Sequence, residues 1–548
     1  MKKIIYIFIL AATLIFYGCG EDFLEHDNLY EKLDADFYSN PDDIQSALTA
    51  AYSCLTTDNG RDDPIFLANL LSDDAFGGGG TDNTDFQDTD GFTNNLEDRY
   101  LDLWETMYKG IFRTNMIITR FDQAEYNDET EKNWHLGEAH FLRAYFYFNL
   151  ARFFGSAPLI TIPEPANLPK APADDLYAQI ATDLKLAIEL MPSTSISQNP
   201  SSQLGRATKW AAEAFMARVF LFYTGYYNET ELNLNDGGKV TKDDVIGWVD
   251  DCIANSGHDL IGDFRNLWPY AWVEEGYPYA ENNNLDWIGD GPENIETVFA
   301  IKFAAYSQHG NLLHYSNQLV TFGAVRAQEN LIPFAMGYGG APCNPQLWES
   351  WDDNDIRKKG TIIDVTDCEE GIICTDYEWG AWSAQQETGF WQKKYVTIQV
   401  DTAGEVLMMY TVITGIPTNY QLGNLQDEVI IRFADVLLMG AELGSAKAQE
   451  YYDRVRTRVG LPTRSATLEN IKEERRYELA FEGIRYFDLL RWHDAEEAFA
   501  KVINIPIKND EVDGLYSASY RPETGGFLPI PESQIRLSEG VLEQNQGW

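Results

Sequence analysis

The sequence has few basic residues, and this shortage excludes some classes of partner. Its 548 residues include 41 Lys and Arg against 86 Asp and Glu, which gives a formal net charge of −45. Nucleic acid requires a basic protein face, and an anionic membrane surface attracts basic segments. We therefore expect neither as a direct partner of the folded chain. A strongly acidic exterior suits an exposed protein that avoids non-specific adhesion.

Beyond its first residues the sequence also has no apolar run long enough to cross a bilayer. The start, MKKIIYIFILAATLIFYGCG, has two lysines, a short apolar segment and small residues before Cys19. This order is typical of a signal peptide. We expect cleavage after residues 1–18 and acylation of Cys19, although Phe16 and Tyr17 differ from the usual lipobox residues. The mature chain, residues 19–548, would then be attached to the membrane by lipid alone.

Cysteine is scarce, with six in the whole chain. If Cys19 carries lipid, an odd number is left, and these cannot all pair. Cys368 and Cys374, in the segment CEEGIIC, close a small loop around Gly371 and are predicted to form a disulfide in an oxidising compartment. Neither His nor a further Cys lies nearby at the spacing of zinc ligands, so a zinc site is not expected there.

Several catalytic and metal-binding patterns are missing. The sequence has no G-x-S-x-G nucleophile motif. His135 and His140 are five residues apart, which places them about 140° apart around a helix, so they are interpreted as surface residues rather than metal ligands. The acidic segments 82–90 and 352–357 lack the glycine and the final glutamate of an EF-hand loop. No cofactor is predicted, although calcium remains open.

Helical periodicity dominates the first half of the chain. Apolar residues recur at three- and four-residue steps in several segments, near 42–55, 98–122, 134–154, 174–191 and 210–227. Helices in consecutive pairs indicate tetratricopeptide-like hairpins stacked into a superhelical scaffold, although no clean 34-residue repeat is present. The predicted fold is mostly α. We expect the scaffold to comprise residues from about 40 to 230 and from about 427 to 500.

Between about 260 and 425 this periodicity fades. Glycine, asparagine, proline and aromatic residues are frequent there, and only short β-like runs such as IETVFAIKF and KYVTIQV interrupt them. Loops on a rigid scaffold commonly carry binding residues. The segment is therefore predicted to be an irregular, loop-rich binding region.

Residues 471–492 form a charged stretch whose carboxylates are either catalytic or part of a buried ion network. Thr467 can cap its helix, which Gly483 is expected to break or end, and Glu474, Glu478 and Glu482 would share one stripe of it. These carboxylates repel one another unless cations pair with them. The predicted partners are the arginines of the same stretch, Arg475, Arg476, Arg485 and Arg491. Because guanidinium groups lower carboxylate pKa values, general acid catalysis is disfavoured. Arg475, Glu478, Glu482 and Arg485 are predicted to act in stability.

Several segments resemble the SusD/RagB family of outer-membrane nutrient-binding lipoproteins. Those near the C-terminus are FADVLLMGAE, DRVRTRVGL, ERRYELAFEGIRYFDLLRW and FLPIPESQIRLSEGVLEQNQGW. Upstream segments are CGEDFLE, FLRAYFYFNLARFFGSAPL and ENIETVFAIKF. Gln546 and Trp548 stand where the family usually has Pro-Gly-aromatic. The resemblance covers nearly the whole chain, in the expected order.

The resemblance implies a protein that binds oligosaccharides, or in some branches peptides, and is not an enzyme. It implies a lipoprotein on the outer face of the outer membrane that covers a SusC-like TonB-dependent transporter. The implied fold is mostly α, with four tetratricopeptide-like helix pairs beside an irregular ligand-binding half. A peptide-binding member of the family, a secreted hydrolase and a repeat protein that binds another protein remain alternatives.

A sugar-binding site requires exposed aromatic rings beside amide or carboxylate groups. The segment SDDAFGGGGTDNTDF offers both, and its four glycines predict a mobile loop. In the family this loop and the region after the ENIETVF-like segment contribute to binding. The predicted ligand-binding residues of the first region are Asp74, Phe76, Asn83 and Phe86. Those of the second are Tyr306, His309, Tyr315 and Tyr338, with Trp272 and Trp287 just upstream.

Overall fold

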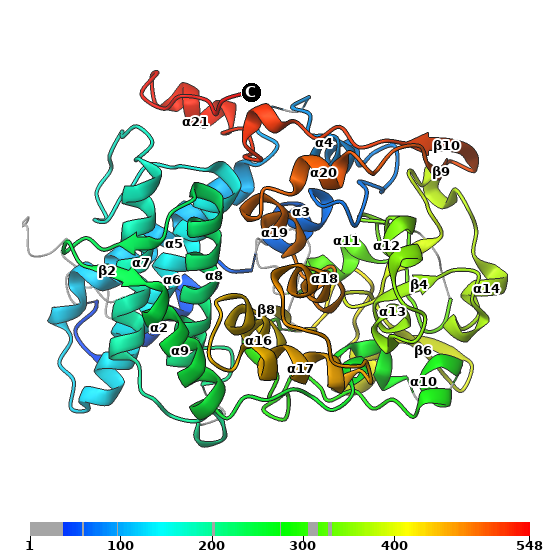
Figure 1. Cartoon of the computed structure of the whole chain (residues 1–548), viewed down its shortest axis with the longest axis horizontal. Helices are drawn as coiled ribbons and strands as arrows, with labels where there is room; N and C mark the ends of the chain where they lie inside the picture. Colours follow the sequence, from blue (N-terminus) through cyan, green and yellow to red (C-terminus); the bar gives the residue numbers. More distant parts are fainter. Residues whose placement is uncertain are drawn as a thin grey trace, which may run out of the picture.

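The structure is a computed structural model. It describes residues 37–56, 60–95, 97–199, 203–273, 276–304, 316–326 and 331–548. The predicted signal peptide, Cys19, Tyr306, His309 and Tyr315 lie outside these residues. The mostly helical fold expected from the sequence is confirmed (Figure 1).

Long helices occupy one side of the molecule (Figure 1). They are α2 (Pro41–Tyr52), α5 (Leu101–Arg120), α6 (Glu129–Phe154), α7 (Ala173–Leu190), α8 (Lys209–Tyr227) and α9 (Lys242–Asn255). Helix α6 is central, because it packs against both α5 and α7 and is buried almost throughout its second half. It begins after Asp128, whose side chain accepts a hydrogen bond from the Thr130 backbone, and ends at Gly155, where φ is 73°.

The other side consists of short elements joined by loops (Figure 1). Its helices include η6 (Phe264–Leu267), η7 (Pro269–Trp272), α10 (Pro278–Asn283), α11 (Gln318–Gly323), α12 (Pro345–Ser350), α13 (Ile356–Thr361), η8 (Cys368–Glu370), α14 (Ile373–Asp376), η9 (Ala381–Ser383) and α15 (Met409–Thr414). Its antiparallel strand pairs are β4 (Ile362–Asp364) with β5 (Phe390–Gln392) and β6 (Gln399–Thr402) with β7 (Glu405–Met408). Of the predicted β-like run KYVTIQV, only the last two residues, Gln399 and Val400, belong to strand β6, so this prediction is only partly confirmed.

Strands from different parts of the chain join the two sides. Strand β3 (Thr297–Ile301), which the segment IETVFAIKF predicted, pairs antiparallel with β8 (Glu428–Arg432). Helices α3 (Pro64–Leu70) and α4 (Thr84–Asp90) come from the N-terminal part of the chain but lie outside the side formed by the long helices. Helix α3 contacts both α11 and α19 (Arg485–Arg491). The remaining pairs are two hairpins, β1 (Glu231–Asn233) with β2 (Lys239–Thr241) and β9 (Ile505–Asn509) with β10 (Val512–Tyr516).

The C-terminal helices lie between the two sides (Figure 1). They are α16 (Phe433–Glu442), α17 (Ala448–Arg458), α18 (Leu468–Glu478), α19, α20 (Ala495–Phe499) and, at the upper edge, α21 (Glu532–Leu537). Thr467 caps α18 as predicted, accepting a hydrogen bond from the Asn470 backbone. The helix ends at Glu478, before Gly483, and Phe481, in the turn that follows, has a left-handed φ of 63°. Glu482 therefore lies beyond the helix that was expected to carry it.

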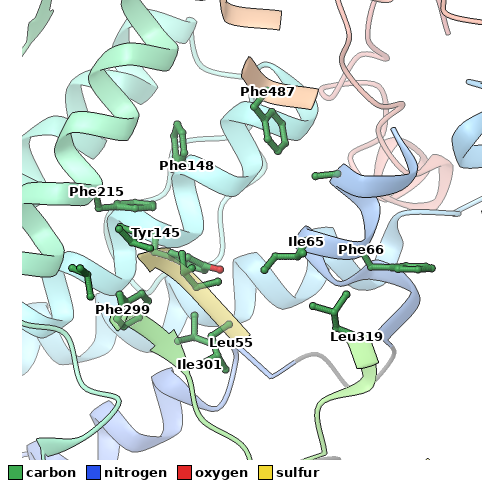
Figure 2. Close-up of a cluster of buried hydrophobic side chains, with 14 of the residues drawn as sticks. Leu55, Ile65, Phe66, Tyr145, Phe148, Phe215, Phe299, Ile301, Leu319 and Phe487 are labelled. Atoms are coloured by element: carbon green, nitrogen blue, oxygen red, sulfur yellow. The ribbon is translucent and has the colours of Figure 1, made fainter. Parts of the chain in front are cut away.

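One apolar core extends through both sides (Figure 2). Tyr145 and Phe148 of α6, Phe299 of β3 and Phe66 of α3 are buried side chains in it. Burial of one such side chain contributes about 1.5–3 kcal/mol. Because α3, β3 and α6 share this core, the helical and irregular sides depend on each other for stability. Within the described residues, no helix is long and apolar enough to span a membrane.

Beside this core lies a buried ion network centred on Glu478. Its carboxylate accepts hydrogen bonds from Arg357 and Arg432, both at 2.9 Å, and from Arg458. Burial alone would raise the pKa of Glu478, but the three guanidinium groups outweigh it and hold the pKa well below its usual range. The network also contains Glu296, Asp355, Lys394, Arg456, Glu474 and Glu482. The prediction that these carboxylates belong to a buried ion network is confirmed.

The predicted pairing within that network is wrong, however. In the described residues, the arginines of the charged stretch do not pair with Glu474, Glu478 or Glu482. Arg475 binds Asp435 at 2.7 Å and Asp488 of the same stretch at 2.8 Å, and Arg485 binds Asp73 at 2.7 Å. Glu474 and Glu478 pair instead with Arg357, more than a hundred residues earlier, and with Arg456 and Arg458 of the preceding helix α17. Helix α18 directs Glu474 and Glu478 away from its own arginines.

The two histidines are buried, not on the surface as expected. The Nδ1 atom of His140 lies 2.7 Å from an Asp183 oxygen, and that of His135 lies 2.9 Å from the Tyr126 hydroxyl. Burial lowers the pKa of His135 to about 4, so this ring is neutral. No group of three or more His, Cys, Asp or Glu side chains suited to a metal occurs within the described ranges.

Cys368 and Cys374 form the predicted disulfide, with their Cα atoms 5.0 Å apart, between η8 and α14. Cys54, Cys252 and Cys343 are buried thiols outside any disulfide. A Cys19→Ser variant is therefore expected to react at three thiols when denatured without reductant, and at five after reduction. Titration with a chromogenic thiol reagent measures both numbers. Five reactive thiols before reduction would contradict the disulfide.

Candidate functional site

The glycine-rich loop, residues 77–80, is buried, so the expectation that it is mobile is wrong. The Gly79 backbone donates a hydrogen bond to Gly339 at 2.7 Å, and Gly80 forms a β-bridge with Ala384. A Cβ atom at Gly80 would overlap the Arg326 guanidinium. Glycine is thus required here for close approach of three segments, and not for flexibility.

Arg326 brings two sequence-predicted regions together. Its guanidinium donates hydrogen bonds to the Asn83 side chain at 3.0 Å and to the Tyr338 backbone carbonyl at 3.1 Å. It also forms an ion pair with Asp82 at 3.1 Å. The Arg326 side chain is only 5% exposed, whereas that of Asp82 is 77% exposed. A buried cation therefore positions an exposed carboxylate beside the loop.

The same arginine holds a tryptophan at the surface. Its guanidinium donates to the Trp382 carbonyl at 3.0 Å and lies 6.0 Å from the centre of the indole ring. Trp382 is 52% exposed, and its backbone is left-handed, with φ 49° and ψ 42°. A bulky residue in this conformation is strained, and such strain concentrates at binding sites.

Tyr338, whose backbone carbonyl Arg326 binds, and its neighbour Tyr420 add two half-buried rings. The Tyr338 ring lies 6.2 Å from that of Tyr420, and the Tyr338 hydroxyl accepts a hydrogen bond from Gln421. We call Asp82, Arg326, Tyr338, Trp382 and Tyr420 together the Trp382 surface. It combines an exposed indole, a carboxylate and phenol groups, which can contact the C–H face of a polar ligand and bind its hydroxyls.

Three other predicted residues are buried beneath or beside this surface. The Asp74 carboxylate accepts a hydrogen bond from Arg476 at 2.6 Å, and Phe76 packs on Tyr516 with ring centres 4.2 Å apart. Phe86 lies in the core, 5.6 Å from Phe322, whose ring contacts Tyr338. Because each is at most 1% exposed, these side chains support the loop in this structure.

Trp272 and Trp287 are half-buried, and no contact among the described residues joins either ring to the Trp382 surface. Trp272 ends η7 and packs on the core, while Trp287 lies 6.4 Å from Tyr410. The sequence interpretation missed Arg326 and Trp382. The segment WGAWS carried a signal, since two tryptophans flank a glycine in an otherwise polar loop.

Comparison with known proteins finds relatives along the whole chain. A family model described as "Starch-binding associating with outer membrane" matches residues 22–221, and the model of the SusD family matches residues 346–548. SusD-like protein P2 of Formosa agariphila is 23% identical, and the alignment covers all of both chains.

Solved structures share the fold. A laminarin-binding SusD-like protein is 25% identical, with a TM-score of 0.71, covering 93% of this chain and 100% of that one. Surface glycan-binding protein A from Bacteroides thetaiotaomicron in complex with laminarihexaose is 22% identical, with a TM-score of 0.71, covering 92% and 99%.

Proposed function

Because this chain belongs to the SusD/RagB family, we propose that it is a surface glycan-binding protein of the outer membrane. It captures an oligosaccharide at the Trp382 surface and delivers it to a SusC-like TonB-dependent transporter. Proteins of this family bind glycans and are not catalysts. The main observation in favour of this site is that Trp382 and Asp82 are both exposed and both contact Arg326. Arg326 binds the Trp382 carbonyl and forms an ion pair with Asp82.

The arrangement suits a sugar for physical reasons. An indole ring offers a flat apolar face that a pyranose can cover with its C–H bonds. The Asp82 carboxylate accepts hydrogen bonds from hydroxyl groups, and charge-assisted bonds of this kind are strong. Arg326 bonds to the Trp382 and Tyr338 backbone carbonyls before any ligand arrives, so the loops that carry these residues need little rearrangement on binding.

Calorimetry with laminarihexaose is the first test, because one structural relative binds laminarin and another was solved in complex with laminarihexaose. We expect binding with no release of shorter sugars during prolonged incubation. Release of shorter sugars would favour the hydrolase alternative. Binding of a peptide library, with no response to a panel of oligosaccharides, would favour the peptide-binding alternative.

The membrane attachment is a separate proposal, supported by Gly18-Cys19 at the end of a short apolar segment. Replacing Cys19 by Ala removes the proposed acylation site, so the protein is expected to move from the membrane fraction to the soluble fraction. Immunoblots of the two fractions measure this change, and Cys54→Ala, at a buried cysteine, is the matched control. Unchanged sedimentation of Cys19→Ala with the envelope would overturn the lipid anchor.

A further inference from the structure

A cavity of about 260 Å³ lies where the helical side meets strand β3, apart from the Trp382 surface. It is formed by η4 (Ile196–Gln198) and the loop after it, His258, strand β3 with the segment before it, and Asp427. Leu204, at its rim, is 45% exposed, so the cavity reaches solvent. It shares no residue with the Trp382 surface.

Four polar atoms of the cavity lining are buried without a hydrogen-bond partner in the described part of the chain. They are Asn199 Oδ1, Gln203 Oε1, His258 Nε2 and Asn294 Oδ1. Each unpaired buried polar atom costs roughly 1–3 kcal/mol, and native proteins contain few of them. Four around one cavity indicate that their partners enter it from outside the protein.

Two of these atoms are fixed as acceptors. The Nδ1 atom of His258 lies 2.9 Å from the Ile295 carbonyl, which can only accept, so Nδ1 carries the proton. Burial lowers the pKa of His258 to about 4, and the neutral ring therefore presents a lone pair at Nε2. Asn294 donates through Nδ2 to the Gly289 carbonyl at 3.3 Å, which leaves its Oδ1 as the open acceptor. A ligand must supply donors at both positions.

The charged groups of the cavity nearly balance one another. Lys302 pairs with Asp427 and donates to the Asp290 carbonyl at 2.6 Å. Burial raises the pKa of Asp290 to about 6 and that of Asp427 to about 8. Near neutral pH the two carboxyl groups together therefore carry about one negative charge. Lys302 offsets that charge, and Arg206, the other cation of the lining, is paired with Glu138. The cavity therefore favours a neutral ligand over a metal ion or an amine.

We propose that this cavity is a second binding site, which takes one neutral sugar ring or a polyol of similar size. Hydroxyl groups supply the donors that His258 Nε2 and Asn294 Oδ1 lack. Ile196, Val298 and Phe299 line the same cavity and can contact C–H groups. Its volume lies just below the range of about 300–1,000 Å³ typical of ligand pockets, so it has room for about one sugar ring inside it. Either site could exist without the other.

The test uses the full chain carrying Trp382→Ala, so that binding at the Trp382 surface does not contribute. D-glucose and myo-inositol are the probes, with calcium chloride and methylammonium chloride as cationic comparisons. Calorimetry is expected to give one site for at least one neutral probe, with a millimolar Kd because so small a ligand makes few contacts. A crystal soaked with that probe should show it within hydrogen-bond distance of His258 Nε2 and Asn294 Oδ1.

Gln203→Leu is the informative variant, because the Gln203 side chain has no hydrogen bond to lose within the described residues. Loss of one ligand hydrogen bond is expected to weaken binding by about tenfold. Gln198→Leu, at an exposed position of η4, is the matched control and should leave the Kd unchanged. Binding of cations alone, water as the sole occupant of the cavity, or an equal Kd in both variants would each overturn the proposal.

Discussion

Replacing Glu478 by Ala is expected to lower the free energy of unfolding by about 3–5 kcal/mol, the usual cost of breaking a buried ion pair. The carboxylate is completely buried and pairs with Arg357, Arg432 and Arg458. Its removal leaves three guanidinium groups out of water with fewer anions to balance them. Chemical denaturation followed by tryptophan fluorescence measures the change.

Helix α18 offers its own control for this experiment. Glu473 is a carboxylate of the same helix, but its ion pair with Arg464 is exposed, with both side chains more than 40% accessible. Glu473→Ala is therefore expected to cost no more than about 1 kcal/mol. Equal losses in the two variants would contradict a special role for the buried network, and so would an unchanged stability of Glu478→Ala.

Replacing Trp382 by Ala is expected to weaken oligosaccharide binding by about thirtyfold, which corresponds to about 2 kcal/mol. The variant removes the exposed apolar face and leaves the Arg326 bonds to Asn83 and Tyr338 in place. Calorimetry with laminarihexaose, or with whichever oligosaccharide the unmodified chain binds, gives the ratio of Kd values. The melting temperature should change little, since about half of the indole lies in solvent.

Trp548→Ala is the matched control for Trp382. That ring is half-buried near the C-terminus, where its Nε1 donates to the Phe527 carbonyl at 2.8 Å. Its removal is expected to leave the affinity for the oligosaccharide unchanged. If a folded Trp382→Ala protein kept its full affinity, the oligosaccharide site would lie elsewhere. The proposed function, binding of the sugar, would still stand.

The features that the sequence predicted well depend on nearby residues. Thr467 caps α18 because its partner, the Asn470 backbone, is three residues away. Cys368 and Cys374 are six residues apart, so their pairing was visible as a small loop. Most of the long helices were found because their apolar residues recur with helical spacing. Helices α6 and α8 are buried on nearly all sides, so their apolar residues are dense but do not form the single stripe that was expected.

The features that the sequence missed depend on distant residues. Glu478 is neutralised by Arg357 and Arg432, and no local pattern marks those arginines as its partners. Arg326 joins Asn83 to Tyr338 and Trp382 only after three loops have met. For the same reason the glycines of residues 77–80 were interpreted as flexible, although the structure uses them to let backbones approach.

The ion network has a consequence for the order in which the chain folds. Its guanidinium groups come from Arg357, Arg432 and Arg458, but Glu474, Glu478 and Glu482 are made later, near the end of synthesis. Proteins are made from the N-terminus, and contacts between distant residues form slowly. The early helix pairs can assemble while the chain is growing. On the irregular side, Asp355 and Glu296 are made before α18 and can pair with these arginines, but they are fewer than the cations of the network. The network is therefore completed, and the irregular side is fully stabilised, only after α18 has been made.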